Sequence, residues 1–201
     1  MPNLALHQLR VAAVASLICD SLMVEVDKDS ITKACLLHDM GNIIKFRLDH
    51  FPELNEPEGL DYWQSVRYDF ILKYGNDEHQ ASLKIATELG LSPLVLDLIN
   101  CVDSASVEII ALEDDFNKKI CLYSDNRVSP HGVVSAEEHS LDAKERYKNH
   151  PHAFSEESRL FFNQNLFEIE NQLFSQLNLK PEEINDEKIE RIIEKMKDFS
   201  I

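Results

Sequence analysis

The stretch LLHDMGN, residues 36–42, places a histidine and an aspartate directly after two leucines. Residues 30–37 carry apolar side chains at helical spacing, which predicts a helix whose buried face runs up to His38. A polar or charged group beside a buried face is rarely left unpaired, so His38 and Asp39 need a partner such as a metal ion. Gly41 and Asn42 are typical of a helix end, and the helix either ends there or continues past a local kink.

Three more polar residues follow or interrupt apolar helical patterns. His7 lies on the apolar stripe of a helix predicted over residues 4–23, and His79 lies near the start of a helix predicted over residues 77–89. Asp125 follows the apolar run of a helix predicted over residues 116–126. Each of these side chains should face the core or its rim, and one metal ion between the helices would satisfy them together. Imidazole and carboxylate ligands suit Mn²⁺, Fe²⁺, Co²⁺, Ni²⁺ or Zn²⁺.

The rest of the chain is also predicted to be helical. Only 5 glycines and 7 prolines occur among 201 residues, which favours long helices joined by short loops. The short apolar run at residues 107–112 is rich in β-branched side chains and fits no single element type. The sequence therefore predicts an all-α fold, with further helices over residues 60–74, 92–102, 135–149, 155–177 and 186–199.

Composition excludes several classes of function. Asp and Glu number 36 against 20 Lys and Arg, a net charge of -16, so broad nucleic-acid binding is not expected. No apolar run approaches the roughly 20 residues of a membrane span, and the N-terminus lacks the pattern of a secretory signal. The four cysteines are far apart in sequence, which favours reduced thiols in a cytoplasmic protein.

The ordered set of His7, His38-Asp39 and Asp125 resembles the H…HD…D signature of the HD-domain metal-dependent phosphohydrolase superfamily. LLHDMGN is similar to the HD-[IM]-G version of that motif. YSDNRVSPHG, residues 123–132, resembles the segment after the last aspartate in a subgroup of bacterial and archaeal members with undefined substrates. The resemblance covers roughly residues 1–150 and implies an HD-domain helical bundle, with residues 151–201 as additional C-terminal helices. These helices are expected to pack on the core or to form a homodimer contact.

The resemblance also implies which residues bind metal. His7, His38, Asp39 and Asp125 match the ligands of a divalent ion. Mg²⁺ is a further candidate for this ion. His79 matches an extra histidine of members with two metals. Such members usually carry another histidine on the next helix, where this chain has LINCVDSAS at residues 98–106. One tightly bound metal is therefore favoured, and a second, weaker site stays open as an alternative.

The sequence indicates the groups that would act on a substrate less clearly than it indicates the metal ligands. Asp39 is expected to serve catalysis through the metal, and Arg10, Arg127 and Lys45 are candidates to steady a phosphate, against the alternative of structural or surface ion pairs. Asn42 stands where many HD-x-G proteins have Lys, so no general acid or base is identified. The aromatic residues of the 60–74 helix are expected to pack in the core or over the site, rather than to stack a nucleobase. They are Tyr62, Trp63, Tyr68 and Tyr74.

The predicted function is metal-dependent hydrolysis of a small phosphorylated substrate, such as a nucleotide, by a phosphomonoesterase or phosphodiesterase. The alternative is a non-catalytic HD-type domain that senses a nucleotide or metal or acts as a scaffold. The other histidines lie in polar, loop-like surroundings and are expected at the surface. They are His50, His131, His139, His150 and His152.

Overall fold

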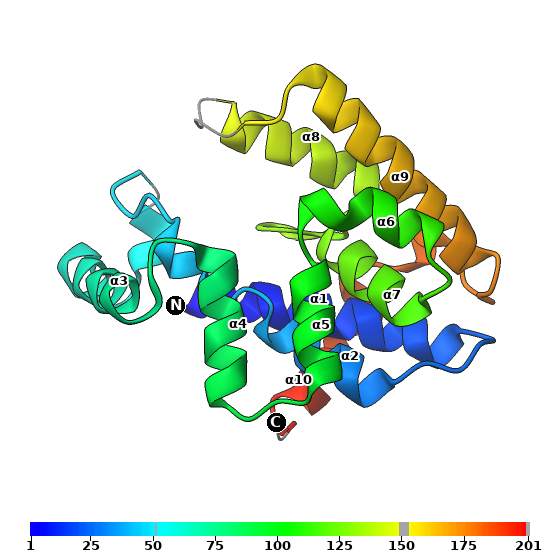
Figure 1. Ribbon diagram of the computed structural model, residues 1–201, viewed down its shortest axis with the longest axis horizontal. Coiled ribbons are helices and arrows are strands. Elements are labelled where there is room, and N and C mark those ends of the chain that lie inside the picture. The colour runs from blue at the N-terminus through cyan, green and yellow to red at the C-terminus, as the bar shows by residue number, and fades with distance from the viewer. Residues whose placement is uncertain (51, 149–152, 200–201) are drawn as a thin grey trace.

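Ten α-helices make up most of the computed structural model, which describes residues 1–50, 52–148 and 153–199. The all-α prediction is confirmed, since the described strands form one short antiparallel hairpin of β1 (Val128–Ser129) and β2 (Gly132–Val133). Four helices lie together at the centre (Figure 1) and contact one another. They are α1 (Pro2–Ser21), α2 (Lys28–Leu37), α5 (Pro93–Cys101) and α7 (Phe116–Asp125).

The central helices form where the apolar spacing predicts them. Val11, Val14 and Ile18 of α1 are almost fully buried, as expected for one helical stripe. Side-chain caps fix where the other three helices begin. In α5, Ser92 accepts a hydrogen bond from the Val95 N–H. Asp27 and Asp115 cap α2 and α7 in the same way. The positions of the polar residues at the helix ends are therefore set by local sequence.

A smaller layer lies beside the central helices. It consists of α3 (Leu60–Tyr74), α4 (Glu78–Glu88) and two short 3-10 turns, η1 (Asn42–Ile44) and η2 (Pro52–Asn55). Trp63 and Tyr74 are buried in its own apolar cluster, which agrees with a packing role for these aromatic rings. Tyr62 and Tyr68 of the same helix are exposed.

The motif at residues 36–42 joins the two layers. Helix α2 ends at Leu37, and the chain passes through a turn into η1 instead of continuing as a helix. The Gly41 N–H donates a hydrogen bond to the Ser82 hydroxyl of α4 at 2.9 Å. A Cβ atom on Gly41 would lie 2.1 Å from the backbone oxygen of Glu78. Gly41 is therefore needed for the close approach of α4 to the end of α2.

The C-terminal helices pack on the same core. Leu166, Ile169 and Leu173 of α9 (Glu156–Phe174) are buried in the main apolar cluster, as is Ile189 of α10 (Asp186–Met196). The ambiguous run at residues 107–112 is a helix, α6 (Val107–Leu112), and contacts α9. Two 3-10 turns, η3 (Ser104–Ser106) and η4 (Pro181–Glu183), complete the described elements.

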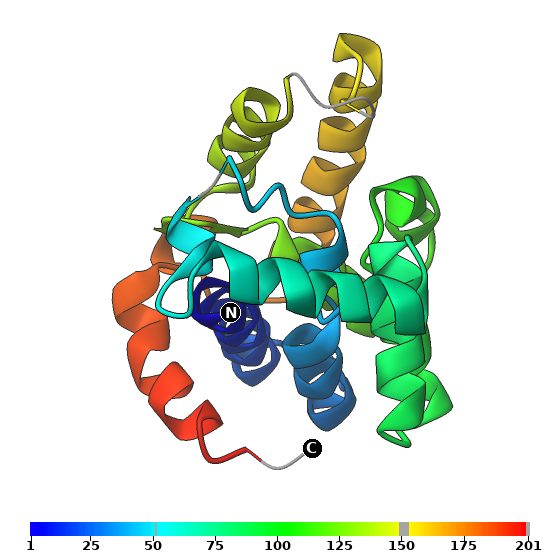
Figure 2. The same cartoon turned by 90° about the vertical axis from the view of Figure 1, so that its left-hand side faces the viewer.

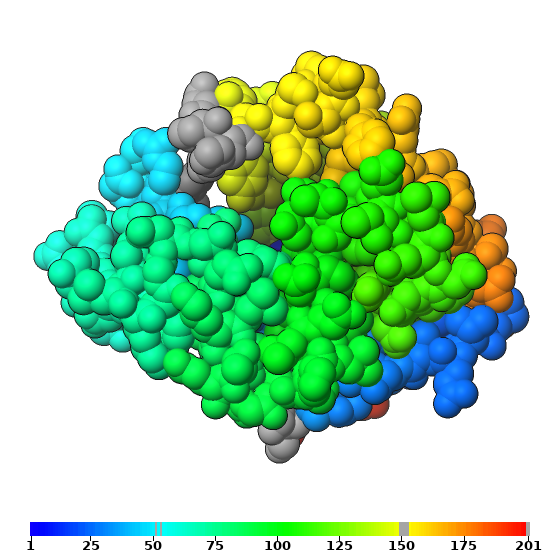
Figure 3. Space-filling model, viewed as in Figure 1, coloured from blue at the N-terminus to red at the C-terminus, as the bar shows by residue number. Residues whose placement is uncertain are grey.

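Helix α8 (Ala136–Tyr147) differs from the others because none of its residues is buried. Figures 1 and 2 show α8 and α9 projecting together from the body of the molecule. In Figure 3 the surface is hollowed between the cyan segment before α3 and the yellow-green α8. Among the described residues, no helix combines the length and apolar content of a bilayer span.

Candidate metal centre

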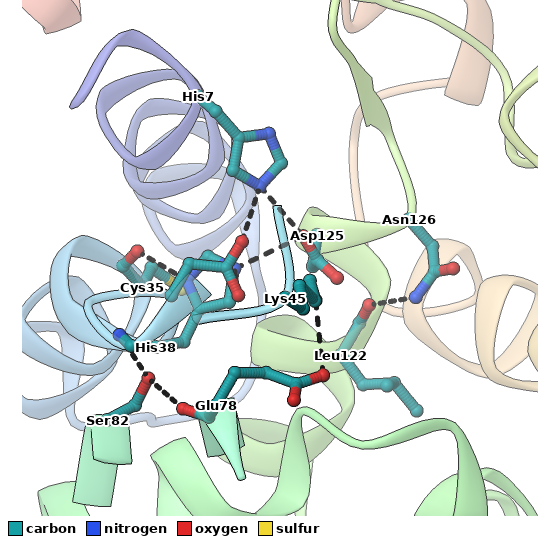
Figure 4. A network of polar contacts seen from close by, with 11 residues as sticks. His7, Cys35, His38, Lys45, Glu78, Ser82, Leu122, Asp125 and Asn126 are labelled. Carbon is teal, nitrogen blue, oxygen red and sulfur yellow. Dashed lines mark hydrogen bonds and ion pairs between the residues drawn. The ribbon is translucent and has the colours of Figure 1, made fainter. Parts of the chain in front are cut away.

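The structure brings together His7 of α1, His38 and Asp39 of the turn after α2, and Asp125 of α7. Figure 4 labels His7, His38 and Asp125 of this set. His7 Nε2 lies 3.5 Å from Asp39 Oδ2 and 3.2 Å from Asp125 Oδ1. His38 Nε2 lies 3.2 Å from the same Asp125 Oδ1 and 3.6 Å from Asp39 Oδ1. Residues more than 80 positions apart in the chain thus point four polar side chains at one small space.

His38 is oriented by the helix that it ends. Its ring Nδ1 lies 2.9 Å from the Cys35 carbonyl oxygen, which can only accept a hydrogen bond. Nδ1 therefore carries the proton, and Nε2 faces the carboxylates of Asp39 and Asp125. This arrangement is usual for metal-binding histidines, in which a backbone carbonyl fixes the tautomer and the ring orientation.

The spacing of the four side chains fits one divalent ion. Two ligand atoms about 2.1 Å from an ion, at an angle of about 90° to 109°, are about 3.0 to 3.4 Å apart. The measured separations of 3.2 to 3.6 Å are close to this range. Among the described residues, His7, His38 and Asp39 offer ligand atoms that all lie within 4.8 Å of one another. Asp125 is outside this group of three, but its Oδ1 lies 3.2 Å from each of the two imidazole Nε2 atoms.

The metal-free centre is held by charge. His38 is buried, and burial alone would lower its pKa, but Asp39 and Asp125 outweigh burial and raise the pKa to about 10. Burial would raise the pKa of Asp125, but hydrogen bonds from His38 and His7 hold it well below its usual range. A protonated His38 therefore lies between carboxylates and takes the place of a cation.

Metal binding is expected to release the His38 proton. With a folded-state pKa of about 10, the metal-free imidazole is protonated at pH 7, and an ion can bind Nε2 only after that proton leaves. The apparent affinity for Mn²⁺ should therefore rise about tenfold per pH unit between about pH 7 and 9. Titration calorimetry in two buffers of different ionisation enthalpy counts the released protons. An affinity that is independent of pH would contradict this account.

Lys45 lies at the edge of the centre. Its Nζ is 3.7 Å from Glu78 Oε1, and its side chain is 35% exposed. Burial acts to lower the pKa of Lys45, but Asp39, Tyr147 and Glu78 outweigh it and raise the pKa. The ammonium group is therefore charged, close to the carboxylates and reachable from solvent, as a phosphate contact requires.

Arg10 and His79 have partners other than the four side chains. The Arg10 guanidinium is paired with Asp186 of α10 at 3.7 Å, which leaves most of its N–H donors unassigned. His79 Nε2 lies 3.4 Å from Asn100 Oδ1, and His79 is not in the group of ligand atoms found among the described residues. The structure thus gives His79 a neighbour other than the four predicted ligands.

The structure places Arg127 in a buried position, where its guanidinium has hydrogen-bond partners within the protein. Its side chain is 2% exposed. The guanidinium donates to the backbone oxygens of Val134, Pro181 and Ile184 and to the Tyr123 hydroxyl. These bonds use four of the five N–H groups of the guanidinium, and they tie the end of α7 to the hairpin and to the segment before α10.

Replacing Arg127 with methionine is expected to lower the free energy of unfolding by about 3 kcal/mol, because several buried acceptors lose their donor. The folded variant should keep its Mn²⁺ affinity, since Arg127 touches none of the four side chains. Denaturant unfolding and Mn²⁺ titration measure the two quantities. If the variant kept its stability but lost hydrolysis, the result would support a phosphate contact by Arg127 instead.

The five histidines expected at the surface differ in their exposure. His50 and His131 are exposed as expected, and His150 and His152 lie outside the described residues. His139 is half-buried on α8, and it interacts electrostatically with Asp125 and His7. The polar pattern around His139 could not indicate this, because the partners are distant in the chain.

A family model described as the HD domain matches residues 4–102. This range includes α1 to α5 with His7, His38 and Asp39, and it ends before Asp125. The inclusion of Asp125 therefore depends on the geometry. No curated protein and no solved structure gives a significant match to the chain.

Proposed function

We propose that the chain is a metal-dependent phosphohydrolase of the HD-domain family, on the premise that residues 4–102 match the model of that family. The observation that carries the proposal is the convergence of His7, His38, Asp39 and Asp125 on one space, with Lys45 beside it. Two imidazoles and two carboxylates are ligands for a divalent transition metal. We propose Mn²⁺, Fe²⁺, Co²⁺, Ni²⁺ or Zn²⁺ as the ion, with Mg²⁺ as a further candidate.

The proposed chemistry follows from the donor set. A divalent ion held by these four side chains would lower the pKa of a bound water and neutralise charge on a phosphate. Asp39 and Asp125 would supply carboxylate oxygens to the ion, and the Cys35 carbonyl orients the His38 ring. The Lys45 ammonium lies where it can bind an anionic phosphate oxygen, and Arg10 is a second cation one helical turn from His7.

The side-chain exposures support access for a substrate. Asp39 and Asp125 are 22% and 27% exposed, whereas His38 is 2% exposed. The carboxylates therefore form the open side of the centre, and the buried imidazole forms its floor. We propose a small phosphate ester as the substrate and a nucleotide as the first class to test. The four cysteines are free, in keeping with a cytoplasmic location.

A panel of nucleotides, phosphomonoesters and phosphodiesters, assayed with Mn²⁺, Co²⁺ and Ni²⁺, tests this function. The matched blank is Asp39→Ala, which removes one carboxylate from the open side of the centre. We expect hydrolysis by the wild-type protein and none by the blank. Equal activity in both would refute the proposal. Nucleotide binding in a thermal-shift assay without turnover would favour a sensing domain, which is the alternative function.

A further inference from the structure

Helix α8 is fixed relative to the metal centre by the segment that follows Asp125. The Val134 N–H donates to the Arg127 carbonyl at 2.8 Å, and the Arg127 side chain donates back to the Val134 carbonyl. Ser135 then begins α8 with a reciprocal pair of bonds to Glu138. The first turn of α8 is therefore held at a defined distance from the end of α7, which carries Asp125.

His139 lies in that first turn, and its backbone N–H bonds to the Ser135 carbonyl at 2.9 Å. The charges that act on its ring are those of Asp125 and His7 in the centre, and of Arg146 and Asp142 on its own helix. Burial is the largest influence and lowers the pKa of His139. The ring is thus a neutral imidazole at neutral pH, with one N–H donor.

This imidazole is half-buried. Within the ranges 1–50, 52–148 and 153–199, its ring takes part in no hydrogen bond or ion pair given by the structure. It is also outside the group of ligand atoms within 4.8 Å of one another. His139 is therefore a half-buried imidazole outside the group of three ligand atoms, in the first turn of the helix that follows Asp125 and the hairpin.

The far end of α8 also approaches the site. Tyr147 interacts electrostatically with Lys45, the cation beside the carboxylates. Since no residue of α8 is buried, the helix contributes little to the core. It instead borders the hollow in Figure 3.

We propose that His139 is a substrate-contacting catalytic residue, whose N–H donates a hydrogen bond to the ester oxygen that leaves phosphorus. This inference rests on the proposed phosphohydrolase function. Lys45 and Arg10 are cations suited to the charged phosphate oxygens, whereas a neutral donor is suited to an oxygen whose charge develops only during bond breaking.

The reaction balances with His139 as a donor that keeps its proton. The oxygen of water forms the new bond to phosphorus, and the ester P–O bond breaks. The electron pair of that bond passes to the leaving oxygen, whose growing negative charge is stabilised by the His139 N–H. Water supplies, through solvent, the proton that ends on the leaving oxygen.

A series of substituted phenyl phosphates, from p-nitrophenyl to p-methylphenyl phosphate, tests the assignment with Mn²⁺ present. For His139→Ala, kcat/KM should fall by less than about tenfold with p-nitrophenyl phosphate, because p-nitrophenolate leaves without help. The fall should reach on the order of 100-fold with p-methylphenyl phosphate. The dependence of kcat/KM on the leaving-group pKa therefore becomes steeper. His139→Gln, which keeps an N–H donor, should recover part of the loss.

His131→Ala is the matched control, since His131 is an exposed histidine of the neighbouring hairpin, and it should behave as the wild type. Mn²⁺ affinity should be unchanged in all three variants. An equal loss for every ester, no loss, or a loss of Mn²⁺ binding by His139→Ala would overturn the role of His139 while hydrolysis by the wild type upholds the proposed function. A wild-type protein inactive on the whole series would overturn both.

Discussion

His38→Ala is expected to bind Mn²⁺ more than about 100-fold more weakly than the wild type and to lose hydrolysis with it. Loss of a hydrogen-bond partner behind a metal ligand already costs about 10- to 100-fold in affinity, and His38 is itself a proposed ligand. Its Nε2 is 3.2 Å from Asp125 Oδ1 and 3.6 Å from Asp39 Oδ1. Without the imidazole, His7 remains as the second proposed nitrogen ligand beside the two carboxylates.

The same substitution should affect the metal-free protein through charge. The raised pKa of His38 means that its protonated form stabilises the fold below the ordinary histidine pKa, and that this stabilisation is lost as the pH rises through about 10. His38→Ala should therefore show weaker dependence of stability on pH in this interval. Calorimetric Mn²⁺ titration and thermal unfolding from pH 6 to 10 measure both effects.

His79→Ala is the matched control for His38→Ala. Its imidazole is next to Asn100 and is not in the group of ligand atoms. We expect Mn²⁺ affinity and hydrolysis to stay at the wild-type level. If His79→Ala lost metal as completely as His38→Ala, the ligand set would have to include His79. If His38→Ala kept its metal, the proposed centre would be wrong.

Gly41→Ala should lower the free energy of unfolding by about 3 kcal/mol and weaken metal binding. The new Cβ would lie 2.1 Å from the Glu78 backbone oxygen and 2.8 Å from the Ala81 Cβ. A backbone atom in a helix cannot move aside as a flexible side chain can, so α4 and the turn after α2 must separate. That turn carries His38 and Asp39, and the neighbouring Glu78 pairs with Lys45.

Two further variants separate this steric effect from others. Ser82→Ala removes the hydroxyl that accepts from the Gly41 N–H, and it should cost about 1 kcal/mol. Gly90→Ala places a Cβ in open space at a φ of 74°, so it should cost about 1 kcal/mol through backbone strain alone. Denaturant unfolding of the three variants gives the comparison. If Gly41→Ala lowered the free energy of unfolding by no more than Gly90→Ala does, α4 would be able to move away from residue 41 at little cost.

Much of the centre could be predicted from the sequence because its determinants are local. The apolar stripe of α1 fixes the face on which His7 lies, and the apolar end of α2 directs His38 inward. The same holds for Asp125 at the end of α7. When helix periodicity decides both burial and direction, polar residues on the buried faces can be identified before the fold is known.

The remaining features depend on contacts that are distant in the chain. Arg127 is buried because the carbonyls of Pro181 and Ile184 accept its N–H groups, more than 50 residues further on. The start of α8, which carries His139, returns toward the end of α7 because the Val134 N–H bonds to the Arg127 carbonyl across the hairpin. The apolar run at 107–112 is helical because it packs against α9, which overrides its β-branched composition. No local pattern contains these contacts.

The metal content of the protein purified without chelator tests the central claim most directly. Elemental analysis of the wild type and of His38→Ala, each after loading with Mn²⁺ and removal of excess ion, gives the stoichiometry. The account predicts one tightly held ion per chain in the wild type and none in His38→Ala. A wild type that retains no divalent ion, or a variant that retains as much as the wild type, would contradict it.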